Sequence, residues 1–348
     1  MRTVRDVHAR TIGAPAGTVG ALLDRLAGDD DPLFPVPVWP AMRFDRPLGT
    51  GATGGHGFVR YRVTAYQPGR RVRFDFPDGG HHAFEVTPLD AGSCRVTHVL
   101  ENRLRGTRRV AWPLAIRWMH ATVVEEVFDN VERAATGTVR APVHRSPYVQ
   151  LLNRLLWDRP TAVGLPAGAR LVRTAFTRTD FQDAWQLPLP PGMPRDPAAW
   201  KGVLRGAFPE QGRATTADGG ELLLGKDARH LDFRASILVE SPAAGADGRT
   251  AGHGGRVTLS TVVRTHHAGG RLYFALVRRV HPVLVRAMLR RTHRRLALAA
   301  PSAGEREWAA RPSGRVRSPD TAVTVPGGRA TRERGSTTDD HGRYLGPE

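Results

Sequence analysis

The order of sequence patterns in residues 1–135 is the feature that most restricts the fold. Residues 4–12 alternate as a strand does, and Pro15 then opens a short amphipathic helix. Further alternating segments follow, separated by turn-forming Gly, Asp and Ser residues, at positions 57–66, 71–76, 82–87 and 94–101. Residues 110–133 have the period of one long amphipathic helix. The order predicts antiparallel strands followed by a helix, and therefore an α+β domain.

Residues 169–298 follow a similar order. An extended start at 170–177 leads to a helix opened by Asp196-Pro197, and a long helix closes the segment at 270–295. Between these helices the alternation predicts strands at positions 221–224, 230–240 and 256–266. We therefore expect a second α+β domain, although the two halves share no evident sequence identity.

Two other segments have different compositions. Residues 136–168 are expected to be a linker, in which Ser146 and Pro147 begin a short helix whose apolar stripe docks on a domain or joins the two domains. Residues 299–348 are rich in Gly, Pro, Ser, Thr and Arg without periodicity, which predicts a disordered tail. The predicted organisation is thus a domain at 1–135, the linker, a second domain at 169–298 and the tail.

The chain carries a formal charge of +18, and Lys201 and Lys226 are the only lysines among its 51 basic residues. Arginine in place of lysine throughout is typical of a GC-rich genome, so the charge alone does not indicate a nucleic-acid partner, and none is expected. Cys94 is the only cysteine, which excludes an intrachain disulfide and a cysteine-based zinc site. The N-terminus has no signal-peptide pattern, and no apolar run reaches the ~20 residues that span a bilayer. We expect a cytoplasmic protein.

Several motifs resemble functional sites without having the context that those sites need. Residues 49–54 fit G-x-G-x-x-G, but alternating residues follow where a dinucleotide site needs a helix, so a flexible loop is expected. Residues 29–31 form an acidic turn without the spaced ligands of a calcium loop. The histidine pairs at 81–82 and 266–267 are adjacent on strands and point to opposite faces, so neither pair chelates one ion. No metal site and no cofactor is therefore predicted, and the standard hydrolase, kinase and metalloprotease motifs are absent from the sequence.

One constellation could carry function. Helical and strand periodicity place His82, His98 and His120, together with Tyr61, on the apolar faces of elements that should pack together. These residues could be core side chains with satisfied hydrogen bonds, could line a mainly apolar ligand pocket, or could include an acid or base near neutral pH. No partner carboxylate for a catalytic histidine is evident. The candidate pocket residues are Trp39, Tyr61, Phe74, His82, Phe84, His98, Trp112, His120 and Val123.

The apolar run at residues 33–40 contains three prolines, which exclude a regular helix or a central strand. Such a loop must be covered by other parts of the protein. Two alternatives stay open, a lid over the mouth of the cavity and a buried crossover.

The first 135 residues resemble the START-like helix-grip superfamily, which includes polyketide cyclases, dehydrases and lipid transport proteins. The resemblance rests on the strand and helix of residues 4–24, on Arg46-Pro47-Leu48-Gly49-Thr50-Gly51-Ala52, on the strand at 94–101 and on the closing helix. It implies a curved antiparallel sheet that grips the C-terminal helix around an apolar cavity. Members range from ligand carriers to cyclases, so the fold does not decide the function.

Residues 170–297 resemble an uncharacterised actinobacterial-type domain family that is often found behind short-chain oxidoreductase domains. The residues that carry this resemblance lie at 180–190, 227–234, 262–266 and 273–281. The family pattern has a further helical stretch where this chain has a short polar link at 208–220, which implies a thinned or opened pocket. His230, Asp232 and Arg234 are expected to share one strand face, as a polar binding surface or as a solvated face with an ion pair.

Three functions follow as hypotheses. The first is binding of an apolar small molecule, such as a polyketide, lipid or isoprenoid, without strong evidence of catalysis. The second is a cyclase- or aromatase-type enzyme that uses His82, His98 or His120. The third is an interaction module for anionic surfaces, because residues 271–295 contain eight arginines and no acidic residue, and a peripheral membrane contact is included here. The apolar stripe of that helix is expected to pack on the second sheet. The oligomeric state is left open.

Overall fold

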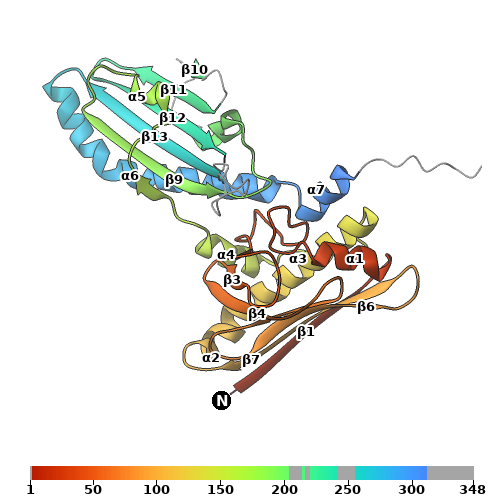
Figure 1. Cartoon of the computed structure of the whole chain (residues 1–348). Coiled ribbons are helices and arrows are strands. Elements are labelled where there is room, and N and C mark those ends of the chain that lie inside the picture. The colour runs from red at the N-terminus through yellow and green to blue at the C-terminus, as the bar shows by residue number, and fades with distance from the viewer. Residues whose placement is uncertain (1, 204–213, 216–219, 242–254, 312–348) are drawn as a thin grey trace, which may run out of the picture. The chain divides into compact units, whose positions relative to one another are not determined.

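The computed structural model describes residues 2–203, 214–215, 220–241 and 255–311, and the residues up to Arg311 gather in one unit (Figure 1). An antiparallel sheet of seven strands in the order β1-β7-β6-β5-β4-β3-β2 forms its first part. The strands are β1 Arg2–Ile12, β2 Arg43–Phe44, β3 Thr53–His56, β4 Val59–Gln67, β5 Arg71–Asp75, β6 His81–Pro88 and β7 Cys94–Leu104. The predicted alternating segments are therefore strands, and the α+β fold class is confirmed.

The long helix predicted at 110–133 is formed in three pieces. These are α2 (Arg108–Ala111), a π-helical turn (Trp112–Ile116) and α3 (Arg117–Thr136). Pro113 lies in the π-helical turn, where its missing N–H interrupts the regular hydrogen-bond ladder. The chain enters α3 only after this irregular turn, and Gly137 ends the helix with φ of 82°.

One face of the first sheet packs against α3 and α1 (Ala16–Leu23). Strand side chains alternate between buried and exposed, as period two requires. The buried residues from α3 include Val124, Val127, Phe128 and Val131, and those from the sheet include Val63, Val72, Phe74, Phe84, Val86 and Val96. An antiparallel sheet packed on the long helix that follows it is the arrangement that the helix-grip resemblance implied for this half.

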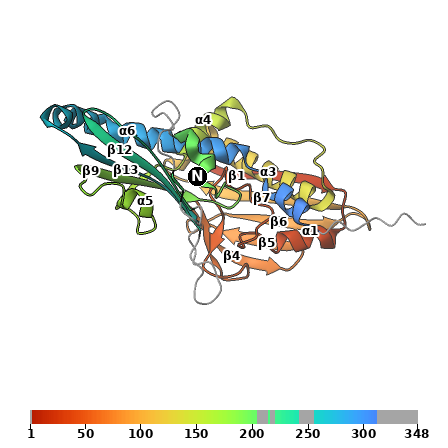
Figure 2. The ribbon, with the colours of Figure 1, turned by 90° about the horizontal axis from the view of Figure 1, so that it is seen from above.

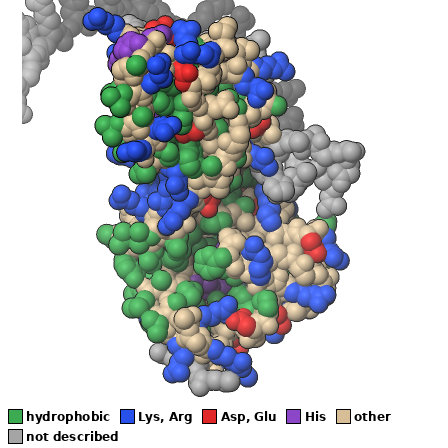
Figure 3. All heavy atoms as spheres, turned by 90° about the vertical axis from the view of Figure 1, so that its left-hand side faces the viewer, with side chains coloured by type: hydrophobic (Ala, Val, Ile, Leu, Met, Phe, Trp, Pro, Cys, Tyr) green, Lys and Arg blue, Asp and Glu red, His purple; other side chains and the backbone are tan. Residues whose placement is uncertain are grey.

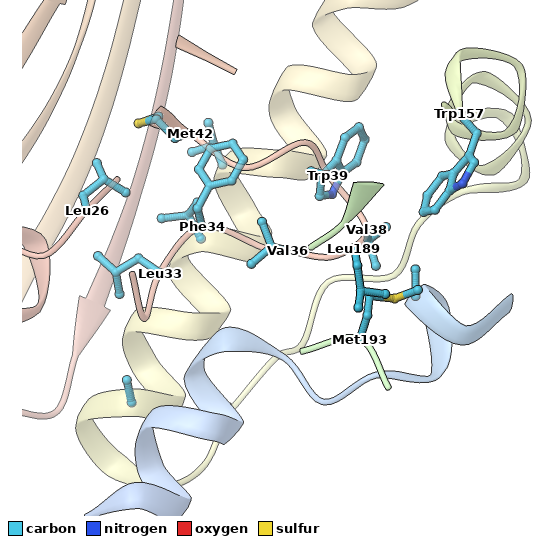
Figure 4. Close-up of a cluster of buried hydrophobic side chains, with 14 of the residues drawn as sticks. Leu26, Leu33, Phe34, Val36, Val38, Trp39, Met42, Trp157, Leu189 and Met193 are labelled. Carbon is cyan, nitrogen blue, oxygen red and sulfur yellow. The ribbon is translucent and has the colours of Figure 1, made fainter. Parts of the chain in front are cut away.

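The apolar run at residues 33–40 is a buried crossover. All residues from Leu33 to Trp39 are buried, and the labelled apolar side chains of this run pack together in Figure 4. Asp31 fixes the start of the run, because its carboxylate accepts hydrogen bonds from the backbone N–H groups of Leu33 (2.8 Å) and Phe34 (3.0 Å). The acidic turn at 29–31 therefore shapes a loop.

The glycine-rich motif at 49–54 leads into β3, and no helix follows it. Gly54 pairs with both Phe44 of β2 and Tyr61 of β4. A Cβ at Gly54 would lie 1.9 Å from the carbonyl oxygen of Arg43, so the close approach of the strands requires glycine. Residues 49–52 form a loop, as expected, and residues 53–54 belong to the sheet, so the motif is not a dinucleotide loop.

A second antiparallel sheet has the strand order β10-β11-β12-β13-β9-β8. Its strands are β8 Thr161–Val163, β9 Phe181–Leu189, β10 Ala214–Thr215, β11 Glu221–Asp227, β12 Leu231–Glu240 and β13 Gly255–Thr265. The helix α6 (Ala268–Ala299) contacts β9 and β13 and runs along this sheet (Figure 2). The remaining helical elements are α4 Pro147–Leu156, α5 Arg170–Arg173, a 3₁₀ helix at Pro197–Val203 and α7 Ala303–Ala310.

One local prediction for the second half was wrong, and one helix is confirmed in a different helical form. The segment at 170–177 was expected to be extended, but it begins with the helical turn α5, because the buried carboxylate of Glu221 accepts hydrogen bonds from the N–H groups of Leu171 and Val172. The helix opened by Asp196-Pro197 is a 3₁₀ helix, which buries Trp200 completely. The polar link at 208–220 lies almost entirely outside the described residues.

The segment predicted to be a disordered tail, 299–348, contains a helix near its start. Residues 303–310 form α7, which starts with a capping box in which Ser302 and Glu305 bond to each other's backbone N–H groups. The N–H of Gly304 donates to Asn130 Oδ1 at 3.2 Å, which fastens α7 to α3. The sequence Ser302-x-x-Glu305 was the missed signal. Residues 312–348 lie outside the described part of the chain.

The two apolar stripes expected to dock are largely exposed. On α6 the side chains that face the sheet include Phe274, Val285 and Leu289. The stripe that we expected to pack there consists of Tyr273, Leu276, Val277, Val280, Val283, Leu284 and Met288. Val277 and Met288 are half-buried and pack against buried clusters, whereas Tyr273 (54%), Leu276 (66%), Val280 (54%), Val283 (65%) and Leu284 (56%) are exposed. On α4 only Val149 and Asn153 are buried, whereas Tyr148, Leu151, Leu155 and Leu156 are exposed.

Candidate functional site

A row of histidines crosses the first sheet on the face that meets α3. His8 of β1 pairs with His98 of β7, which in turn lies diagonal to His82 of β6. The Nε2 atom of His98 is 3.3 Å from Nδ1 of His82. The inward alternation of three neighbouring strands thus brings these rings into one line.

Aromatic rings extend this row. The His82 ring lies 4.7 Å from the ring of Phe74 and 4.9 Å from that of Tyr61, between ring centroids. On the other side, His120 of α3 lies 5.1 Å from His98, and Trp112 lies 6.1 Å from His120. These offset and edge-to-face contacts are typical of aromatic clusters.

The structure therefore brings together most of the predicted pocket residues. The aromatic cluster contains Tyr61, Phe74, His82, Phe84, His98, Trp112 and His120. Val123 is half-buried on α3 and packs against the main core. Trp39 lies elsewhere, in the buried crossover, where its Nε1–H donates to Glu126 Oε2 at 2.6 Å.

Sequence reasoning missed the acidic partners of the histidines. Asp6 Oδ2 is 3.0 Å from His120 Nδ1, and Asp6 Oδ1 is 3.4 Å from His8 Nε2. Glu125 of α3 accepts from His8 Nδ1 at 2.7 Å and from Arg10 at 2.8 Å. The signal was the alternation of Asp6, His8 and Arg10 on β1, which places three polar side chains on the face that meets α3.

The surroundings of these histidines give them different pKa values. Hydrogen bonds to Asp6 and Glu125 raise the pKa of His8 to about 9, and the hydrogen bond from His120 holds the pKa of Asp6 well below its usual value. Burial lowers the pKa of both His82 and His98 well below the ordinary value. At neutral pH, His8 is a cation whereas His82 and His98 are neutral.

These protonation states limit the acid–base chemistry of the site. Neutral His82 and His98 can donate or accept one hydrogen bond on each ring nitrogen, but their low pKa makes them weak bases. His120 has the carboxylate partner that the sequence did not reveal, Asp6, and this contact fixes the orientation of its ring. Cyclase-type catalysis by one of the three histidines stays a prediction, and His120 is the residue best arranged for it.

Two buried polar atoms in the cluster have no hydrogen-bond partner among the described residues. They are the hydroxyl of Tyr61 and Nδ1 of His98, on side chains that are 3% and 1% exposed. Figure 3 shows a hollow lined by hydrophobic side chains in the lower half of the view, with histidine atoms inside it. An apolar site with a few unpaired polar atoms has the composition of a small-molecule site.

A separate cavity of about 540 Å³ lies beside the buried crossover. Its lining mixes apolar side chains such as Val36 and Val38 with charged ones that include Glu126, Arg133 and Arg294. Glu126 is already paired there, with Arg145 at 2.5 Å. This cavity contains none of the aromatic cluster and is not the predicted pocket.

The polar face predicted in the second half is an ion-pair network. His230 precedes β12 and packs its ring on Tyr273, so it is not part of the strand row. Asp232 is 4% exposed and accepts from Arg264 (2.5 Å) and His266 (3.0 Å), while Arg234 pairs with Asp227 at 2.6 Å. The ring of Phe176 lies over both Arg234 and Arg264. Asp232 and Arg234 are therefore partly covered and internally paired, which corresponds to the expected alternative of a face with an ion pair.

Comparisons with known proteins assign no function. A family model described as a protein of unknown function (DUF2867) matches residues 212–288, within the segment for which we expected an uncharacterised family. Comparison with curated proteins gave no match. No helix among the described residues has the length and apolar character needed to cross a membrane.

Solved structures match about two fifths of the chain. One is a solution structure from Thermobifida fusca, with 19% identity over 42% of this chain and 100% of that chain and a TM-score of 0.31. Norcoclaurine synthase from Thalictrum flavum, in complex with dopamine and hydroxybenzaldehyde, is 12% identical over 40% of this chain and 90% of its own, with a TM-score of 0.32. CalU16 from Micromonospora echinospora is 10% identical over 44% of this chain and 83% of its own, with a TM-score of 0.29.

Proposed function

We propose that the protein is a cytoplasmic binder of an apolar small molecule, polyketide-, lipid- or isoprenoid-like, held between the first sheet and α3. The observation that carries the proposal is the pair of unpaired polar atoms, Tyr61 Oη and His98 Nδ1, buried in an aromatic cluster. An unsatisfied buried polar atom costs about 1–3 kcal/mol. A carbonyl or hydroxyl oxygen on an otherwise apolar ligand would remove that cost. In this proposal the second half forms a separate domain whose family role, including any association with oxidoreductases, is still to be tested.

Removal of the Tyr61 hydroxyl tests the proposal. The neutral ketone dye Prodan is a suitable probe, because its fluorescence reports an apolar environment and its carbonyl can accept a hydrogen bond. We expect Prodan to bind the wild-type chain and to bind Tyr61→Phe about 2- to 10-fold more weakly. This loss of affinity corresponds to one hydrogen bond, which contributes about 0.5–1.5 kcal/mol. Tyr66→Phe is the matched control, since Tyr66 lies near the other end of β4 and its hydroxyl donates to Asp24 at the end of α1.

Two results would contradict ligand binding at this site. One is equal Prodan affinity for wild type, Tyr61→Phe and Tyr66→Phe. The other is a chain that binds no Prodan and, after incubation with a hydrophobic cell extract, carries no additional mass in native mass spectrometry.

A second candidate function is peripheral association with an anionic membrane through α6, and the exposed apolar stripe favours it. The stripe Leu272, Tyr273, Leu276, Val280, Val283 and Leu284 covers about a third of the helix circumference. The helix carries eight arginines and no acidic residue between positions 271 and 295. A second copy would bring like charges together, whereas anionic lipid offers complementary charge to a basic amphipathic helix. Arg290 donates to the backbone oxygens of Arg154 and Leu155, so the exposed leucines of α4 adjoin this helix.

Vesicle binding tests this candidate. We expect the chain to sediment with phosphatidylglycerol vesicles, and less so as the salt concentration rises. The double variant Leu276→Asp/Val283→Asp should lower the partition coefficient at least 10-fold, because burial of each apolar side chain contributes about 1.5–3 kcal/mol. Leu89→Asp, in an exposed turn, is the control. Equal binding to phosphatidylcholine vesicles would exclude recognition of anionic lipid. A dimer in light scattering that the double variant breaks would exclude the membrane as the partner.

A further inference from the structure

Asp6, His8 and His120 bring three metal-ligating atoms together at the edge of the histidine row. One atom from each residue lies within 4.8 Å of the others, and all three residues are half-buried. The two histidines come from different elements, β1 and α3, so the tertiary fold assembles the group. We propose that these three side chains bind one divalent transition-metal ion, with Zn²⁺ as the reference ion.

Two of the three donor pairs, one through each oxygen of Asp6, lie at distances that fit a shared ion. Asp6 Oδ2 and His120 Nδ1 are 3.0 Å apart, and Asp6 Oδ1 and His8 Nε2 are 3.4 Å apart. Donors about 2.1 Å from a zinc ion, at angles near tetrahedral, lie about 3.4 Å from each other. Two histidines and one carboxylate also form a donor set that zinc and other first-row metals use, and three protein ligands leave a position for water or a ligand oxygen.

The surroundings of His8 resemble those of a metal-bound histidine. Its Nδ1 faces Glu125 at 2.7 Å, which leaves Nε2, 3.4 Å from Asp6 Oδ1, as the atom that would release its proton and ligate the ion. A histidine that binds a metal usually donates its other ring N–H to a carboxylate. Arg10 holds the second oxygen of Glu125 at 2.8 Å, so the orienting carboxylate is itself fixed.

The local charge also favours a cation. Arg10 contacts three carboxylates of α3, namely Glu125, Asp129 and Glu132, and Asp6 adds a fourth carboxylate. Arg140 also lies 3.8 Å from Glu132. Acidic groups therefore outnumber the cations here, although the chain as a whole carries +18. A bound divalent ion would reduce the repulsion among carboxylates that α3 and β1 bring together.

Metal uptake by the full chain is the direct test, and it needs neither the proposed ligand nor any activity. We expect one Zn²⁺ per chain after dialysis, measured by elemental mass spectrometry. Co²⁺ substitution should give a visible absorption band of nitrogen and oxygen coordination. His8→Ala and His120→Ala should each lower zinc affinity at least 100-fold in calorimetric titrations. Glu125→Gln should lower the affinity about 10- to 100-fold, as loss of an orienting carboxylate does.

Matched variants separate a specific site from unspecific binding. His144→Ala removes an exposed histidine elsewhere and should leave the stoichiometry and affinity unchanged. Asp6→Asn keeps the side-chain shape, so it tests the site if an alanine variant fails to fold. The proposal is overturned if the wild-type chain binds no Zn²⁺ at saturating concentration, or if Asp6→Asn and His120→Ala retain wild-type affinity. Because Prodan binding is measured on metal-free protein, failure of the metal site is distinguishable from failure of the ligand site.

Discussion

Phe128→Ala is expected to lower the free energy of unfolding by about 3–5 kcal/mol. Phe128 lies at the centre of α3 with no exposed surface, and it belongs to the cluster that joins this helix to the first sheet. Truncation removes the transfer free energy of the ring and leaves a cavity that a helix held at both ends cannot close. The measurement is guanidinium unfolding followed by far-UV circular dichroism.

Phe58 provides the matched control for this prediction. It lies in the turn before β4 and is 81% exposed, so Phe58→Ala should change the free energy of unfolding by no more than about 0.5 kcal/mol. Similar losses for the two variants would mean that α3 is not packed on the sheet as described. The same pair also tests the fold of the half that holds the histidine row, independently of any ligand.

Five of the seven strands of the first sheet were predictable because their signals are local, whereas the short strands β2 and β3 were not predicted. Glycine- and aspartate-containing turns separate the strands, and alternation alone assigned their inward residues. The strand β9 was not predicted, because Pro188 lies within it and Pro190 follows it. Pro188 is tolerated where β9 pairs with Arg256 of β13, a position that sequence alone does not reveal.

The errors on α6 have a different cause. This helix has apolar residues on two sides. From the sequence alone, either the side with Tyr273 and Leu276 or the side with Phe274 and Leu289 could pack against the sheet. Which side faces inward depends on how the helix leaves β13. His267 caps the N-terminus of α6 by accepting from the N–H of Gly270, and a Cβ at Gly270 would lie 2.1 Å from the carbonyl oxygen of His230. These tertiary contacts set the rotation of the helix.

The candidate site was predictable only in part for a similar reason. Periodicity placed His82, His98 and His120 on inward faces, and the structure brings their rings together. Periodicity could not reveal that Asp6 contacts His120, because those residues are 114 positions apart. They meet only when β1 joins the edge of the sheet beneath α3. Polar residues that periodicity places on the inner face of a strand should therefore be treated as candidate site residues.

Acidification is expected to destabilise the protein through His82. Burial holds the folded-state pKa of His82 well below the unfolded value of about 6.5, so the unfolded chain takes up this proton first as the pH falls. The stability that neutral His82 provides is therefore complete above pH ~6.5. Below it the free energy of unfolding should fall by about 1.4 kcal/mol per pH unit from this one residue, until the pH reaches the folded-state pKa.

Guanidinium unfolding at pH 7.5, 6.0 and 5.0 measures this dependence. His82→Phe keeps an aromatic ring against Phe74 and Phe76, and we expect its slope against pH to be smaller than that of the wild type by about 1.4 kcal/mol per unit below pH 6. Val86→Ala, on the same face of β6, should lower stability at every pH without changing the slope. The variants keep all carboxylates of the wild type. A difference in the slope of the free energy of unfolding against pH is therefore due to His82. Identical slopes for wild type and His82→Phe would show that this imidazole reaches water in the folded state, and the histidine row would then be an open polar surface rather than a buried site for an apolar ligand.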